Sequence, residues 1–139
     1  MTNTTDATGT TTTDIAEIVD RYLAVWSFAD ADDRAEAVAG LWTADGVEYI
    51  EGKQFRGHAE LTDRVTEAHE AFVGNGAYTA TGGDDATRHG DVVTFTIRLD
   101  HATGPAGDTA WSARVFLVLA EDGRVREDYQ LTVQPLAAV

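Results

Sequence analysis

The sequence predicts an α+β domain in which three N-terminal helices cover one face of a curved antiparallel or mixed sheet. Two observations support this prediction. Apolar residues in the first half of the chain recur three and four positions apart, which is the period of an α-helix. In the second half, apolar and polar residues alternate between glycine-containing turns, which is the pattern of β-strands. Helices that come first and antiparallel hairpins that come last are typical of the α+β class.

The folded domain is expected to span residues 14–136. Residues 1–13 are mostly threonine and have no apolar face to bury, so we expect them to be disordered. The first helix should begin at Asp14, because the sequence over 14–17 resembles a capping box, and should end near Phe28. Its apolar face consists of Ile15, Ile18, Val19, Tyr22, Leu23 and Trp26.

Two further helices are expected. A second capping-box pattern at 33–36 precedes a short helix that continues to Trp42, and the Asp-Gly pair at 45–46 predicts a turn. The third helix should begin at Gly57 and stop at the Gly-Asn-Gly sequence of 74–76. Its apolar stripe consists of Leu61, Val65, Ala68, Phe72 and Val73.

The remaining segments are expected to form strands. The expected strands are 47–51, 77–81, 93–101, 111–119 and 125–133. Strict alternation over 93–101 indicates one apolar and one polar face. Residues 82–90 and 102–108 are expected to be loops. The Asp-Gly pair at 122–123 predicts a hairpin turn, and Pro135 ends the last strand.

Composition narrows the range of partners. The formal net charge is −14, so the surface repels nucleic acids and anionic lipids, and neither is expected as a partner. No apolar run approaches the length of a membrane span, and the N-terminal residues lack the apolar core of a secretory signal. The chain contains no cysteine. A cytoplasmic location fits these observations.

Several short motifs occur together in the order typical of one family. They are 22–26 (YLAVW), 41–47 (LWTADGV), 55–58 (FRGH), 122–125 (DGRV) and 128–130 (DYQ). Over residues 14–135 the chain resembles the SnoaL-like, nuclear transport factor 2-like superfamily. That superfamily includes ketosteroid isomerases, limonene epoxide hydrolase, polyketide cyclases and binding proteins without catalytic activity. The resemblance implies a cone-shaped domain with a mostly apolar pocket between the sheet and the helices, and leaves the function open.

Three residues are catalytic candidates. Asp128 occupies a late-strand place comparable to that of the pocket carboxylate of SnoaL-like cyclases, and burial would raise its pKa towards that of a general base. The alternative is that Asp128 is a solvated side chain at the start of a strand and has no catalytic role. His101 shares the apolar parity of its strand and would assist at the pocket rim, or else faces water. Tyr22 stands where the isomerases place the phenol that donates to an oxyanion, or is a core aromatic residue.

Further residues are candidates for binding a substrate. Gln130 shares the strand face of Asp128. Glu48 and Tyr49 alternate on the first strand, so one of them faces the pocket, and the register stays open. The other candidates are Trp26, Trp42, Trp111, Phe95, Val115 and His69. At least two of the tryptophans are expected to be core residues, and His69 lies beside the apolar stripe of its helix.

The chain also departs from these relatives. The catalytic aspartate of the isomerases falls near Ile50, and their oxyanion-binding acid falls near Val115, which argues against steroid isomerisation. Residues 98–100 (Arg-Leu-Asp) resemble the Arg-x-Asp pair of limonene epoxide hydrolase, although they share parity with the polar face. The four histidines show no metal-binding spacing, and no cofactor is implied. They are His58, His69, His89 and His101.

The sequence therefore favours a cofactor-independent acid–base enzyme that acts on a small apolar molecule, of the SnoaL-like cyclase or isomerase kind. One alternative is a small-ligand-binding module of the same fold without catalysis. Another is an epoxide hydrolase of the limonene epoxide hydrolase kind. A homodimer is expected through the outer face of the sheet, which carries Tyr129, Leu131 and Val133.

Overall fold

The computed structural model describes residues 6–103 and 108–136. Its helices are α1 (Asp6–Val25), α2 (Ala31–Leu41) and α3 (Gly57–Ala68), and a π-helical turn, η1 (His69–Val73), follows α3. Its strands are β1 (Trp42–Ile50), β2 (Lys53–Arg56), β3 (Tyr78–Gly82), β4 (Thr87–His89), β5 (Val92–His101), β6 (Thr109–Leu119) and β7 (Val125–Gln134). Helices precede most of the strands, so the predicted α+β class is confirmed.

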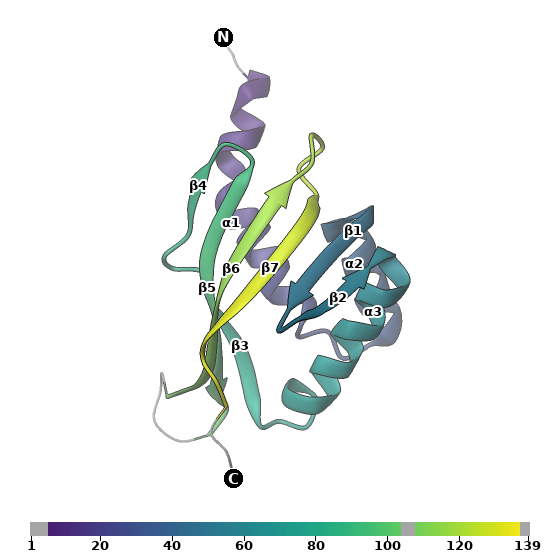
Figure 1. Cartoon of the computed structure of the whole chain (residues 1–139), viewed down its shortest axis with the longest axis vertical. Coiled ribbons are helices and arrows are strands. Elements are labelled where there is room, and N and C mark those ends of the chain that lie inside the picture. The colour runs from purple at the N-terminus through teal and green to yellow at the C-terminus, as the bar shows by residue number, and fades with distance from the viewer. Residues whose placement is uncertain (1–5, 104–107, 137–139) are drawn as a thin grey trace.

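The strands form one curved sheet with the order β2-β1-β7-β6-β5-β3, and β4 pairs with β5. Most neighbouring strands are antiparallel, but β1 and β7 run parallel, so the sheet is mixed. In Figure 1, α1 passes behind the sheet, and α2 and α3 lie beside β1 and β2. We call the sheet face that is covered by the helices the inner face.

The hydrophobic core lies between the inner face and the helices. From the helices it includes Ile18, Val19, Tyr22, Val25, Val38, Leu41, Leu61 and Val65, and from the sheet Val93, Phe95, Ile97, Ala113, Val115 and Leu117. Each fully buried apolar side chain of this kind contributes about 1.5–3 kcal/mol relative to its exposed state. Close approach of α1 to the sheet depends on Gly83, because a Cβ atom there would lie 2.3 Å from Cγ1 of Val19.

The first two helices begin and end at other residues than predicted. The helix α1 starts at Asp6, so residues 6–13, which we expected to be disordered, are helical, and residues 1–5 lie outside the described residues. Extending an existing helix gains one hydrogen bond per residue, and this outweighs the weak helix propensity of threonine. The helix α2 is capped by Asp30, whose side chain accepts hydrogen bonds from the backbone of Asp32 and Asp33 at 2.9 and 3.0 Å. Within the described residues, none of the helices is long and apolar enough to cross a membrane.

The strands also correct the prediction at three places. Trp42 starts β1 instead of ending a helix, and the expected turn at 45–46 is an irregularity inside β1, where the pairing with β7 shifts register. The short strands β2 and β4 were not predicted, and β4 lies in the expected loop 82–90. Both are too short to show a clear alternation. Of the expected loop at 102–108, residues 104–107 lie outside the described residues.

Candidate functional site

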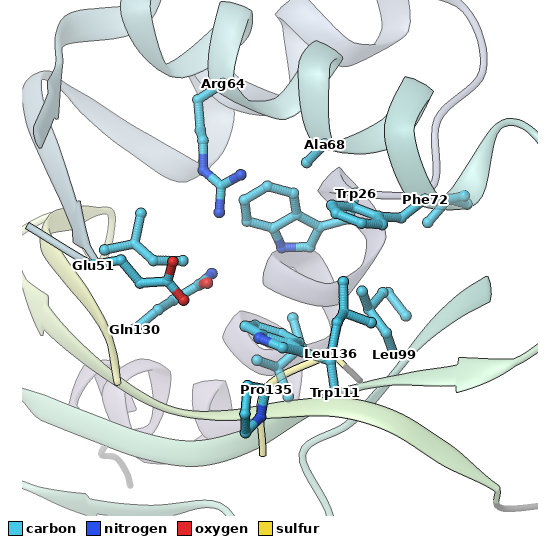
Figure 2. Close-up of a pocket in the computed structure, with 14 residues that line it drawn as sticks. Trp26, Glu51, Arg64, Ala68, Phe72, Leu99, Trp111, Gln130, Pro135 and Leu136 are labelled. Carbon is cyan, nitrogen blue, oxygen red and sulfur yellow. The ribbon is translucent and has the colours of Figure 1, made fainter. Parts of the chain in front are cut away.

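A cavity of about 420 Å³ opens between the inner face of the sheet and α3. This volume is within the range that small-molecule sites occupy. Most of its wall is apolar and comes from Ile50, Ala68, Phe72, Val73, Ala80, Ile97, Leu99, Trp111, Pro135 and Leu136. Figure 2 shows the polar side chains Arg64, Gln130 and Glu51 on one side of the space, with Trp26 beside them. The cavity therefore suits an apolar molecule with one polar end.

Two carboxyl groups are buried next to this polar wall. The parallel pairing of β1 and β7 sets Glu48 directly beside Asp128, and both residues are fully buried. On the same inner face, Ile50 of β1 pairs with Gln130 of β7, and both of these line the cavity. The register of β1, which the sequence left open, thus turns Glu48 inward.

Three further side chains complete what we call the carboxyl cluster, which consists of Tyr22, Glu48, Arg64, Asp128 and Gln130. The phenol oxygen of Tyr22 lies 3.1 Å from Oδ1 of Asp128 and 3.4 Å from Oε2 of Glu48. Gln130 donates from Nε2 to the Tyr22 oxygen at 2.6 Å and to Oε2 of Glu48 at 3.3 Å. Arg64 donates from Nε to Oε1 of Glu48 at 2.8 Å.

The carboxyl cluster disfavours the charged form of Asp128. Burial raises the pKa of Asp128 well above its ordinary value, and the charge of Glu48 and a hydrogen bond with Glu48 raise it further. The opposing influences of Tyr22 and Arg64 are smaller. Oδ2 of Asp128 has no hydrogen-bond partner among the described residues. A carboxylate oxygen can only accept, so Asp128 can share a hydrogen bond with Glu48 when one of the two groups carries a proton.

Tyr22 is a neutral donor in this cluster. Its ring is fully buried and meets Trp42 and Phe95 edge to face, with centroid distances of 6.1 and 5.5 Å. Burial raises the pKa of Tyr22 well above 10, and the nearby charges of Asp128 and Glu48 act in the same direction. The phenol therefore keeps its proton and can donate to a carboxyl oxygen.

The structure brings together several of the residues that the sequence singled out. Tyr22, Glu48, Asp128 and Gln130 belong to the carboxyl cluster. Trp26 and Trp111 line the cavity together with Gln130. Trp42, Phe95 and Val115 are fully buried core residues, and they are not among the residues that line the cavity.

Three other candidates lie elsewhere. His101 is exposed at the end of β5 and contacts the ring of Tyr78 at a centroid distance of 5.4 Å. It keeps the parity of Leu99, since Leu99 and His101 pair with Ala80 and Tyr78 of β3, but it lies at the strand end and is not among the residues that line the cavity. His69 is buried in η1, outside the cavity lining. Tyr49 stacks on Tyr129 at 4.9 Å, on the strand face opposite Glu48.

The expected Arg-x-Asp pair also lies apart from the cavity. Arg98 and Asp100 approach each other to 3.7 Å, and Asp100 accepts hydrogen bonds from Thr81 and Thr109 at 2.8 and 2.9 Å. None of these residues is among those that line the cavity. The parity argument, which assigned Arg98 and Asp100 to the polar face, agrees with this placement.

The sequence interpretation missed Arg64, which both binds Glu48 and lines the cavity. A signal was available, because Arg64 lies three residues after Leu61 and four before Ala68, on the apolar stripe of α3. An arginine on such a stripe needs a partner for its charge when it is buried. Within the described residues, no group of three or more histidine and carboxylate side chains is placed to hold a metal ion.

The curved mixed sheet, its three covering helices and the enclosed cavity define the nuclear transport factor 2-like class of fold, as the sequence predicted. Solved structures agree. A SnoaL-like family protein of Agrobacterium tumefaciens, provisionally assigned as an isomerase, superposes with a TM-score of 0.75 at 21% identity, over 87% of this chain and 98% of its own. A provisionally assigned polyketide cyclase of Sinorhizobium meliloti gives 0.61 at 19% identity, over 82% and 93%.

A third structure extends the comparison. It is a protein of Catenulispora acidiphila with a ketosteroid isomerase-like fold, solved in complex with trimethylamine, and it gives a TM-score of 0.60 at 19% identity, over 82% of this chain and 83% of its own. No protein-family model matches the sequence, and no curated protein matches it either. At these identities the likeness establishes the fold, and function has to be argued from the site.

Proposed function

We propose that this chain is a cofactor-independent acid–base enzyme that acts on a small apolar molecule, of the SnoaL-like cyclase or isomerase kind. The observation that supports this most strongly is a buried carboxyl pair beside a mostly apolar cavity. Glu48 and Asp128 are both fully buried, and the cavity wall next to them contains Gln130 and Arg64. Perturbed carboxyl groups beside a pocket are typical of sites that move protons.

The two carboxyl groups would have different roles. Asp128, whose pKa is raised, would carry a proton and act as the acid, whereas Glu48, ion-paired with Arg64, would accept a proton. Tyr22 would stabilise the negative charge that develops on Asp128 when it gives up its proton, because the neutral Tyr22 hydroxyl donates to that carboxyl group. Asp128 was expected to act as a base with help from His101, but its raised pKa and the exposure of His101 favour this revised assignment.

Gln130 separates the carboxyl pair from the cavity. It lines the cavity and also donates to Tyr22 and Glu48, whereas Asp128 and Glu48 are not among the lining residues. Proton transfer to a molecule in the cavity therefore requires the Gln130 amide to move aside. The same arrangement favours the rival function, a binding module in which the cluster only shapes the wall of the cavity.

Exchange of carbon-bound hydrogen separates the two functions without knowledge of the natural substrate. The probe is 2-tetralone in D₂O, and proton NMR follows the loss of its α-hydrogens. We expect the wild-type chain to accelerate this exchange, and Glu48→Gln and Asp128→Asn to lower the acceleration by about 10² to 10⁴-fold. Asp63→Asn, at an exposed position of α3, is the matched control and should keep the wild-type rate. Binding of 2-tetralone without any acceleration would contradict catalysis and support the binding module.

Pairing of two copies through the outer sheet face stays a prediction. Leu131 and Val133 on that face are 57% and 69% exposed, next to the stacked pair Tyr49 and Tyr129. Exposed apolar patches of this kind often mark protein interfaces. Sedimentation of the wild-type chain should show a dimer, and Leu131→Lys should shift it towards the monomer. A monomeric wild-type chain at all concentrations would contradict this expectation.

A further inference from the structure

We propose that the cavity holds its ligand by a hydroxyl group, of the alcohol, phenol or enol kind, which accepts hydrogen bonds from Trp26 and Arg64 and donates one to Gln130. This inference rests on the site of the proposed function and names the chemistry of its ligand. It starts from two buried polar atoms of residues that line the cavity, neither of which has a hydrogen-bond partner in the described part of the chain.

The first of these atoms is the indole nitrogen of Trp26. The residue is 5% exposed and lines the cavity, and its Nε1 has no hydrogen-bond partner in the described part of the chain. Figure 2 shows the nitrogen-bearing edge of the indole turned towards the space enclosed by the lining residues. A buried donor without a partner costs about 1–3 kcal/mol, and a ligand oxygen would remove that cost.

The second atom is the amide oxygen of Gln130, a residue that is 2% exposed. Its Nε2 points at Oε2 of Glu48, and this carboxylate oxygen can only accept, so the orientation of the amide is fixed by its neighbour. The oxygen Oε1 is then left as an acceptor, and it has no partner among the residues described. A ligand group that satisfies it must carry a hydrogen-bond donor.

Arg64 brings the donor and the acceptor to one wall. Its guanidinium lies over the Trp26 ring at 5.1 Å from the centroid, and its Nε donates to Glu48, the same carboxylate that Gln130 contacts. The two terminal nitrogens of Arg64 make no hydrogen bond to the residues described, and Figure 2 shows the guanidinium turned towards Gln130 and Glu51. A hydroxyl oxygen can accept from this side while its hydrogen donates to Gln130.

Charge argues against a carboxylate as the ligand's polar end. The positive charge of Arg64 is already balanced by Glu48 at 2.8 Å, and Glu51 adds a further negative group to the wall. A second anion at this place would face carboxylates without a free cation to balance it. A ketone or an ether could accept from Trp26 but would leave Oε1 of Gln130 unpaired. A hydroxyl group is the smallest neutral group that satisfies both sides from a single atom, and the apolar wall accommodates the hydrocarbon body.

Three naphthalene probes of similar size test this directly in the full chain by titration calorimetry. They are 2-naphthol, which donates and accepts, 2-methoxynaphthalene, which only accepts, and 2-naphthoate, which is anionic. We expect 2-naphthol to bind at least about tenfold more tightly than either of the others, since an unpaired buried acceptor costs about 1.4 kcal/mol or more. Equal affinities for 2-naphthol and 2-methoxynaphthalene, tightest binding of 2-naphthoate, or no binding of 2-naphthol at its solubility limit would each overturn the proposal.

Variants of the lining residues show which side chains cause the preference for 2-naphthol. Gln130→Met should make the affinities for 2-naphthol and 2-methoxynaphthalene equal, and Trp26→Phe should weaken both by a similar factor. Gln54→Met, at an exposed position of β2, is the matched control and should keep the wild-type preference. The comparison of probes on the wild-type chain stands even if a variant fails to fold. A preference for 2-naphthol without any exchange of 2-tetralone would leave this inference intact and contradict catalysis. Accelerated exchange of 2-tetralone without a preference for 2-naphthol would contradict only this inference.

Discussion

Two neighbouring regions of the inner sheet face differ in chemistry although the same helices cover both. On β5 and β6 the inward positions are Phe95, Ile97, Val115 and Leu117, all apolar and almost completely buried. On β1 and β7 the inward positions include Glu48, Asp128 and Gln130, which are just as deeply buried. Burying polar groups weakens a fold unless every group finds a partner. The apolar region therefore stabilises the chain, and the polar region is where selection for function is expected.

The two regions should also respond differently to change. Apolar burial is non-directional, so loss of one side chain removes its own contribution and leaves a cavity. The carboxyl cluster depends on each partner, because loss of one leaves the others buried and unsatisfied.

Replacement of Arg64 by methionine should have the largest effect. It leaves the Glu48 carboxylate fully buried without its ion-pair partner, and breaking a buried pair in this way costs about 3–5 kcal/mol. Denaturant unfolding measures the loss. Addition of Glu48→Gln to the Arg64→Met chain should restore most of it, because the unpaired charge is then gone. A double variant no more stable than Arg64→Met alone would show that the charge of Glu48 is not the cause.

Truncation in the apolar region should cost slightly less. Ile97→Ala removes a buried side chain and should lower the free energy of unfolding by about 2–5 kcal/mol. The loss should be the same at acidic and alkaline pH, because the strand partners of Ile97, Ala113 and Gly82, do not titrate. A loss for Ile97→Ala that changes with pH would show that the two regions are coupled and would break the contrast between them.

Removal of the Tyr22 hydroxyl should have an intermediate effect. Tyr22→Phe keeps the aromatic contacts with Trp42 and Phe95, but it deprives Gln130 of its 2.6 Å acceptor and Asp128 of a donor. The expected loss is about 1–3 kcal/mol in denaturant unfolding. A Tyr22→Phe chain as stable as the wild type would mean that these hydrogen bonds are replaced by others.

Asp128→Asn should change the free energy of unfolding least at acidic pH. Whether the variant is less or more stable than the wild type depends on pH. An asparagine resembles a protonated carboxyl group, so at about pH 4 the variant should be within about 1 kcal/mol of the wild type. The pKa of Asp128 is raised in the folded state. Between its unfolded pKa and its folded pKa the native state binds more protons, and wild-type stability falls as pH rises, by up to about 1.4 kcal/mol per pH unit.

The asparagine variant has no such proton to lose. Its stability should therefore fall less steeply with pH, and it should become the more stable chain as pH rises. Denaturant midpoints at several pH values measure both curves. Parallel curves for the wild type and Asp128→Asn would contradict the raised pKa.

The sequence predicted those elements whose signals are local. Strict alternation identified β5, the Asp-Gly pair at 122–123 identified the hairpin between β6 and β7, and Gly57 was correctly predicted to begin α3. Short edge strands such as β2 lack enough residues to show a period. The start of α1 was missed because threonine has a weak helix propensity, which extension of an existing helix can override.

The site was predicted in part for a similar reason. Strand parity set Asp128 and Gln130 on one face, and the structure buries both. The neighbour of Asp128 could not be predicted, because Glu48 comes beside it only through the parallel pairing of β1 and β7. The two residues lie far apart in the sequence, and no local signal indicates which strand pairs with which. Arg64 could have been found from its place on the apolar stripe of α3. His101 shares the strand face of Leu99, as parity predicted, but parity alone could not show that the cavity lining stops before the last residue of β5.

The assignment of Asp128 as the acid depends on a pKa that burial beside Glu48 raises well above its ordinary value. Carbon-13 NMR of the side-chain carboxyl carbons, assigned by comparison with Asp128→Asn, measures this directly. We expect the Asp128 signal to stay at the position of a protonated acid well above the pH at which an exposed aspartate titrates. A signal that titrates near its ordinary value, about pH 4, would contradict it.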